Sequence, residues 1–136
     1  SVIYDGISIT QSNEMWFQNK IVYSNFIKSF KDRESGDFSH ELRVTVTYYG
    51  NWHNFERAAY KGGSDAGFVF INDVVESCDG NTCKLTESFA IPLNESFLKK
   101  NLDGFSLKAF AQSGQEIILD VTNFQIDAQL SYLGLK

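Results

Sequence analysis

The sequence is poor in proline, cysteine and histidine, and each scarcity narrows what the chain can be. One proline, Pro92, stands among 136 residues, so no proline-rich hinge divides them. There is also no internal repeat and no low-complexity stretch. We therefore expect a single domain over residues 1–136.

Basic clusters and long apolar runs are missing as well. The net charge is −5, and no run of Lys or Arg is longer than Lys99–Lys100. Because phosphate binding needs a concentrated positive field, we expect no nucleic-acid partner. No apolar run approaches the roughly 20 residues that span a bilayer, so we expect no transmembrane segment. The composition leaves the oligomeric state open.

Aromatic residues, by contrast, are abundant. They make up 15% of the chain, with 12 Phe, 6 Tyr and 2 Trp. Since each can bury about 150–250 Å², a few of them supply much of a hydrophobic core. A chain of this length buries roughly two-thirds of its unfolded surface and can fold without a metal ion.

The only two cysteines, Cys78 and Cys83, bracket the turn-forming segment Asp79–Thr82. Strand-like residues lie on both sides, and facing residues of a hairpin come close enough to form a disulfide. Disulfides persist mainly outside the cytoplasm, so the pair indicates an exported protein. The alternative is two reduced cysteines that happen to lie close together.

Alternating apolar and polar residues predict a mainly β protein. The clearest case is His40–Tyr49, in which Leu42, Val44, Val46 and Tyr48 share one face. Polar residues 11–14 and 31–39 are expected to be loops, and residues 52–60 fit either a helical turn or an edge strand. Phe68, Phe70 and Asn72 are expected on one face of their strand. The expected strands are residues 2–9, 21–30, 40–49, 67–75, 82–93, 105–111 and 116–121.

Two short helices are predicted beside these strands. Asn94 can cap a helix that runs to Leu102. The segment Thr122–Gln125 matches a capping box and predicts a helix over residues 122–133, although alternating apolar residues there also fit a strand. The fold class is therefore an antiparallel β-sandwich or twisted antiparallel sheet, with helices at about 94–102 and 122–133.

No motif for metal, cofactor or nucleophilic chemistry stands out. Cys78 and Cys83 have a spacing found in zinc sites, but His40 and His53 lie at opposite ends of one expected strand. Both histidines are expected at the surface. No Gly-x-Ser-x-Gly segment and no phosphate-binding glycine loop occurs. We expect no catalytic residues, no metal and no cofactor.

A pair of carboxylates is the one feature that suggests a hydrolase. Glu76 and Glu87 lie on the two arms of the cysteine hairpin, diagonal to each other rather than opposed. An ordinary surface position explains Glu76. Glu87 interrupts an apolar face, and a structural ion pair with Arg43 or Arg57, or a bulge in the strand, explains it better than catalysis.

Aromatic side chains are the best candidates for a binding surface. Trp16, Trp52 and Tyr49 could stack on sugars or pack against a protein partner, together with Phe17, Tyr48 and Phe55. Packing in the core is the competing interpretation, because a chain with this many aromatics needs most of them inside.

Eleven residues between positions 42 and 93 form a loosely spaced pattern: Thr47, Tyr48, Trp52, Phe55, Ala58, Gly63, Val74, Val75, Cys78, Cys83 and Glu87. This pattern resembles a group of small, uncharacterised bacterial envelope proteins, many of which are lipoproteins. The resemblance implies a periplasmic or lipid-anchored setting and a structural cysteine pair, and it implies no activity. A lipid anchor would need a cysteine that precedes Ser1.

Together these observations predict a non-enzymatic binding domain of a periplasmic or extracellular protein, whose partner is another protein or a cell-wall component. A carbohydrate-binding module that uses the exposed aromatics is the first alternative. A glycan hydrolase that uses Glu76 or Glu87 is the second.

Overall fold

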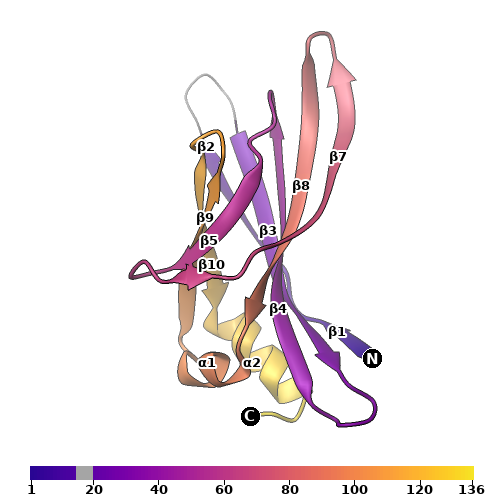
Figure 1. Cartoon of the computed structure of the whole chain (residues 1–136), viewed down its shortest axis with the longest axis vertical. Coiled ribbons are helices and arrows are strands. Elements are labelled where there is room, and N and C mark those ends of the chain that lie inside the picture. Colours follow the sequence, from indigo (N-terminus) through magenta and orange to yellow (C-terminus); the bar gives the residue numbers. More distant parts are fainter. Residues whose placement is uncertain (15–19) are drawn as a thin grey trace.

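The computed structural model describes residues 1–14 and 20–136 and confirms a mainly β, antiparallel fold with two short helices (Figure 1). The larger sheet has six strands, and the smaller sheet has four. The larger sheet comprises β1 (Val2–Asp5), β2 (Ile9–Glu14), β3 (Lys20–Lys31), β4 (Phe38–Tyr49), β7 (Val69–Asp79) and β8 (Thr82–Leu93). The smaller comprises β5 (Phe55–Tyr60), β6 (Asp65–Ala66), β9 (Gly104–Ala111) and β10 (Glu116–Thr122).

The order of the strands leaves β7 at one edge of the larger sheet. That sheet runs β1-β3-β4-β8-β7, and β2 pairs with β3 beside β1. The smaller sheet runs β10-β9-β5-β6. The helices α1 (Glu95–Lys100) and α2 (Asn123–Tyr132) lie together at one end of the molecule (Figure 1). No helix in the described part of the chain has the length and apolar character needed to cross a membrane.

The core lies between the two sheets and is built from alternate residues of their strands. On β4, Leu42, Val44, Val46 and Tyr48 are all at most 2% exposed, which confirms the inward row predicted from the sequence. The smaller sheet and α2 contribute apolar residues to the same cluster, among them Phe55, Leu107, Leu119 and Ile126. Period-two alternation therefore decides which side chains are buried.

Two predictions about the elements were wrong or incomplete. Residues 11–14, expected to be a loop, belong to β2 because their backbone pairs with β3 from Tyr23 to Lys20. The side chain of Gln11 also bonds across to the smaller sheet: its Oε1 accepts from the amide of Asp120 at 3.0 Å, and its Nε2 donates to that carboxylate at 2.9 Å. Residues 55–60, left open between helix and strand, form β5.

Bulges in β7 change which of its residues share a face. The pairing of β7 with β8 shifts between Phe70 and Asn72 and again between Val75 and Ser77. Phe70 lies opposite the buried Phe89, whereas Asn72 lies opposite Ser88 on the other face. The prediction that Phe70 and Asn72 share a face was therefore wrong, because a bulge inserts an extra residue that periodicity alone does not reveal.

The predicted C-terminal helix is confirmed, and a residue of its capping box also bonds to the larger sheet. Thr122 accepts from the amide of Gln125, whose Oε1 accepts from the amide of Thr122 at 3.0 Å. The Nε2 of Gln125 reaches the larger sheet, at 2.9 Å from Oδ1 of Asn25 and 3.0 Å from the carbonyl of Ile7. Gln125 is 1% exposed, so these bonds are protected from water and tie α2 to the larger sheet.

We expect Gln125→Ala to lower the free energy of unfolding by about 3 kcal/mol, because it removes a cap and leaves buried carbonyl oxygens without donors. Gln112→Ala, at an exposed position in the β9–β10 turn, is the control and should change it by less than about 0.5 kcal/mol. Urea denaturation of both variants measures the difference. Equal effects would show that the buried amide contributes nothing.

Candidate functional site

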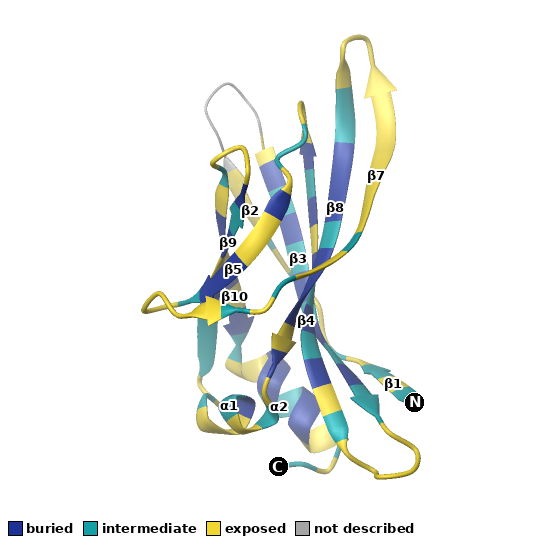
Figure 2. Ribbon diagram, viewed as in Figure 1, coloured by how far each residue is buried: buried dark blue, intermediate teal, exposed yellow. Residues whose placement is uncertain are grey.

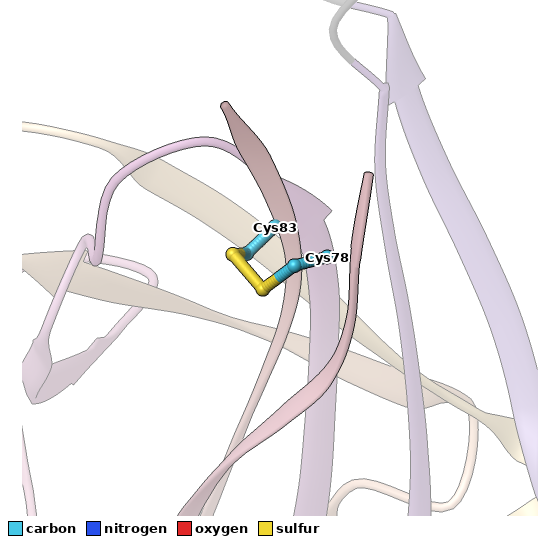
Figure 3. The surroundings of a disulfide bond; sticks show 2 residues. All are labelled: Cys78 and Cys83. Carbon is cyan, nitrogen blue, oxygen red and sulfur yellow. A yellow bond between two sulfur atoms is a disulfide. The ribbon is translucent and has the colours of Figure 1, made fainter. Parts of the chain in front are cut away.

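The hairpin of β7 and β8 carries the predicted disulfide. Cys78 and Cys83 pair directly across the two strands and are joined through their sulfurs, with Cα atoms 4.0 Å apart (Figure 3). The strands continue past the cysteines to Asp79 and Thr82, so the turn is the two residues Gly80–Asn81 rather than the four expected. Gly80 has φ 65°, the left-handed conformation that such tight hairpin turns require.

Most of β7 is exposed on both faces (Figure 2). Phe70 is 59% exposed and Val75 is 53% exposed, and Val69 and Val74 are also exposed. Among the described strands, only β8 pairs with β7. A long strand with apolar side chains and one unpaired edge is a template for pairing with another chain.

The hydrogen bonds of β8 show which backbone groups of β7 point to that open edge. The carbonyl of Cys83 accepts from the amide of Gly50 at 3.1 Å, so Cys83 bonds toward β4 and not toward β7. Because bonding direction alternates along a strand, Leu85 and Glu87 also bond toward β4. Their partners on β7, which are Cys78, Val75 and Asp73, therefore direct their amides and carbonyls away from β8.

The side chains of these same β7 residues belong to the inner face of the hairpin. They lie opposite Cys83, Leu85 and Glu87, of which Leu85 and Glu87 are buried. Phe70, opposite the buried Phe89, continues the row. The inner row of β7 thus reads Phe70, Asp73, Val75 and Cys78. The far end of the β7–β8 hairpin projects beyond the smaller sheet (Figure 2).

Glu87 is the central buried acid of this region, with 4% exposure. Its Oε1 accepts from the amide of Phe55 at 2.9 Å, and its Oε2 accepts from the amide of Asn54 at 3.2 Å and from the hydroxyl of Tyr48. Three donors therefore hold one carboxylate between β8 and the start of β5. Asn54, with φ 59°, turns the chain so that two consecutive amides face the acid.

Tyr48 and His53 complete this cluster. The Tyr48 hydroxyl accepts from the amide of His53 at 2.8 Å, and His53 Nδ1 lies 2.8 Å from Ser113 Oγ. Burial raises the pKa of Tyr48, and its hydrogen bond to Glu87 raises it further. Burial lowers the pKa of His53, against the opposing effect of the Glu87 charge. Both side chains are therefore neutral near pH 7.

Asp73 stands directly opposite Glu87 in the pairing of β7 with β8. Partial burial raises the pKa of Asp73, and the Glu87 charge raises it further. Like charges opposite each other across two strands repel. Glu87 has three donors to compensate its charge, whereas no ion pair of Asp73 is found among the described residues.

The structure does not place Glu76 opposite Glu87, and it contradicts the predicted ion pair of Glu87. Glu76 is an exposed residue at a bulge, and the acid opposite Glu87 is Asp73. Glu87 bonds to Tyr48 and backbone amides rather than to an arginine. Arg43 bonds to Glu41 at 2.6 Å, and Arg57 lies 3.8 Å above the ring of Phe110. The predicted ion pair was wrong because backbone amides supply the donors.

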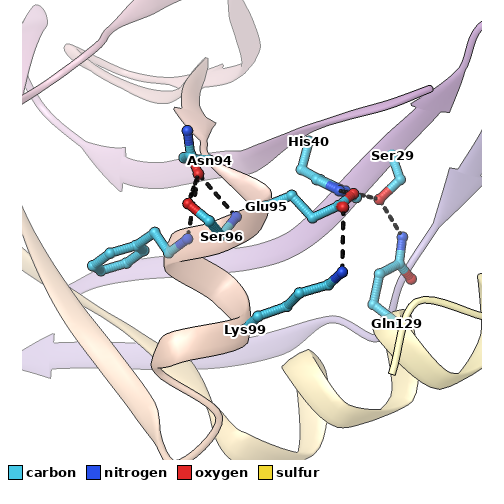
Figure 4. A network of polar contacts seen from close by, with 8 residues as sticks. Ser29, His40, Asn94, Glu95, Ser96, Lys99 and Gln129 are labelled. Atoms are coloured by element: carbon cyan, nitrogen blue, oxygen red, sulfur yellow. Dashed lines mark hydrogen bonds and ion pairs between the residues drawn. The ribbon is translucent and has the colours of Figure 1, made fainter.

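A second polar cluster at the helical end has the composition of a serine hydrolase triad (Figure 4). Ser29 Oγ lies 2.7 Å from His40 Nδ1, and His40 Nε2 lies 2.9 Å from Glu95 Oε1. Gln129 of α2 donates to Ser29 Oγ at 2.8 Å. Four elements, β3, β4, α1 and α2, meet in this one hydrogen-bonded chain.

This cluster holds the four elements together by hydrogen bonds and is not a nucleophilic site. Ser29 is 0% exposed and its oxygen already accepts from Gln129, so no substrate carbonyl can reach it. His40 is 5% exposed, and the prediction that it lies at the surface was wrong. The inward row of β4 passes from Leu42 back to His40, and extending the alternation by two residues would have found it.

The structure places the candidate aromatic residues in different environments. Tyr49, which is 51% exposed, and Trp52, which is partly buried against the core, line one cleft of about 390 Å³ with Tyr48 and His53. Trp16 and Phe17 lie outside the described residues. Phe55 is 6% exposed and belongs to the core, as the competing interpretation held.

No protein-family model, curated protein or solved structure matches this chain. The resemblance of residues 42–93 to bacterial envelope proteins therefore stays a prediction. The open edge of β7 and the cleft beside Tyr49 are candidate binding surfaces.

We expect Glu87→Gln to lower the free energy of unfolding by about 2–3 kcal/mol, because the new amide nitrogen would face a backbone donor instead of accepting from it. Glu116→Gln, which removes a half-exposed charge paired with Lys108, should change it by less than about 0.5 kcal/mol. Thermal and urea unfolding measure both. A Glu87→Gln protein as stable as the control would contradict this account of Glu87.

The hydrogen bond from His40 holds the pKa of Glu95 below its ordinary value, with a smaller contribution from Lys99. The stability it provides is therefore present above the unfolded pKa of about 4.3 and is lost as pH falls through the lower folded value. We expect Glu95→Gln to cost about 1 kcal/mol at pH 7 and progressively less as the pH falls below the unfolded pKa. Urea unfolding across this range checks it, and a pH-independent cost would contradict it.

Proposed function

We propose that this chain is a non-enzymatic binding domain of a periplasmic or extracellular protein, and that it binds a protein partner along the open edge of β7. The observation that carries the proposal is the eleven-residue edge strand with unpaired backbone groups and exposed Phe70 and Val75. Strand addition supplies backbone hydrogen bonds for affinity and side-chain contacts for specificity.

The disulfide supports both the setting and the use of this hairpin. A bond between Cys78 and Cys83 persists in an oxidising compartment, which favours an exported protein. It also fixes the register of β7 against β8 near the end of the projecting hairpin (Figure 1). A strand held in register offers its partner a preorganised edge, which reduces the entropy lost on binding.

The proposal is tested by selecting peptides from a random library on the wild-type protein alone and then comparing their affinities for wild type and Val75→Pro. Val75 directs its amide to the open edge, so proline there removes an outward donor and spares the bonds between β7 and β8. We expect enriched peptides that bind wild type and lose at least about tenfold in affinity for Val75→Pro. The melting temperatures of wild type and Val75→Pro, measured by circular dichroism, should agree within a few degrees.

Val74→Pro is the matched control, since Val74 lies opposite Thr86 at a position that bonds toward β8. Unlike Val75→Pro, Val74→Pro should lower the melting temperature, because it removes a backbone donor that bonds to β8. Peptides that bind wild type and Val75→Pro equally well would contradict a role for the open edge.

A carbohydrate-binding function is a second candidate, favoured by the cleft that Tyr49 and Trp52 share. Aromatic faces bind the apolar faces of sugar rings, and Tyr49 is exposed enough to do so. Titration with cell-wall glycan fragments should then change tryptophan fluorescence in wild type and not in Tyr49→Ala. A flat response of wild type across such a panel would exclude this function.

A further inference from the structure

We propose that the partner strand carries a lysine or arginine that faces Asp73, with apolar residues two positions before and after it. This inference rests on the proposed function, because it specifies the chemistry of the strand that adds to β7. The surface concerned is the inner row of β7, defined by Phe70, Asp73 and Val75, together with the unpaired backbone beside it.

The alternation of an added strand sets which of its side chains matter. Every second residue of a strand points to the same face, and residues opposite each other across two strands contact directly. β8 already meets the inner row with residues two apart, since Phe89, Glu87 and Leu85 lie opposite Phe70, Asp73 and Val75. A regular strand on the open edge meets the row with the same spacing, which gives the sequence pattern apolar-x-basic-x-apolar.

The central position of the pattern is set by charge. Asp73 lies opposite the buried Glu87, so two acids are adjacent on the inner face and only Glu87 is compensated by donors. Asp73, Glu76 and Asp79 make β7 acidic, and the strand contains no Lys or Arg. A cation from the partner would neutralise the uncompensated acid, and its aliphatic stem would cover the exposed Phe70 and Val75.

The same charges disfavour a second copy of this chain as the occupant. Two β7 strands pairing edge to edge would bring together two acidic segments that have no basic residue between them. Like charges across strands are destabilising, and natural edges use inward-pointing charges to prevent such pairing. The occupant must therefore supply the opposite charge.

The test uses two blocked synthetic peptides as probes, Thr-Val-Thr-Lys-Thr-Val-Thr and the same peptide with Glu in place of Lys. Affinities are measured by calorimetry or fluorescence anisotropy for wild type, Asp73→Asn and Asp73→Lys. We expect the Lys peptide to bind wild type at least about tenfold more tightly than the Glu peptide. Asp73→Asn should abolish most of that preference, and Asp73→Lys should reverse it.

Glu34→Gln is the matched control, because it removes one exposed carboxylate in the turn between β3 and β4. It should leave the preference for the Lys peptide unchanged. Both Asp73 variants are expected to melt at or above the wild-type temperature, because they remove the acid opposite Glu87. That melting temperature shows that a changed affinity does not come from unfolding.

Each contrary outcome has a distinct meaning. Equal binding of both peptides, lost in Val75→Pro, would overturn the charge inference and leave edge binding intact. Absence of binding by either peptide would also overturn the inference, while the random-peptide selection would still decide the proposed function. Dimerisation of wild type that Val75→Pro abolishes would identify a second copy as the occupant and overturn the inference.

Discussion

The two sheets share no strand pairing among the described strands, and the carboxylate of Glu87 links them on one side. It accepts hydrogen bonds from the amide of Phe55, the first residue of β5, from the amide of Asn54 just before it, and from the hydroxyl of Tyr48. On the opposite side, Gln11 bonds to the amide and the carboxylate of Asp120 in the same manner. The sandwich is therefore closed by the buried Glu87 and by the exposed hydrogen bonds between Gln11 and Asp120 as well as by its apolar core, and every buried side-chain polar atom of the described residues has a partner.

This mode of closure leaves β7 without a second neighbour. The position of Glu87 fixes β5 against β8, and β7 extends beyond that contact with its inner row only partly covered. Two bulges and three acidic residues are features that keep an edge strand from pairing indiscriminately. Under the proposed function, the same acids also select the partner, because a basic strand would complement their charge.

Much of the fold could be predicted from the sequence, because local patterns decide it. Period-two alternation located β4 and its buried face, the spacing of Cys78 and Cys83 predicted their disulfide, and the capping box at Thr122 predicted α2. Residues 11–14 were misassigned because all four are polar and show no alternation, and the side chain of Gln11 bonds to a strand more than 100 residues away, which no local pattern records. The bulges in β7 likewise leave no signal in its alternation.

The candidate site was harder to predict because it depends on pairing. The sequence marked Glu87 as an acid on an apolar face but could not show that backbone amides compensate it or that Asp73 lies opposite. The exposure of Phe70 and Val75 follows from the edge position of β7, which is a property of sheet order and not of the residues themselves. Tyr49 and Trp52 were named from the sequence as candidate binding residues, and the cleft that they share became visible only in three dimensions.

Amide hydrogen exchange of β7, in the free protein and in the protein saturated with a selected peptide, tests the central claim most directly. The account predicts that the amides of Asp73, Val75 and Cys78 exchange quickly in the free protein and become protected on binding. Those of Val74 and Ser77 should be protected in both states, because they bond toward β8. Protection that appears instead around Tyr49 and Trp52, with β7 unchanged, would contradict it.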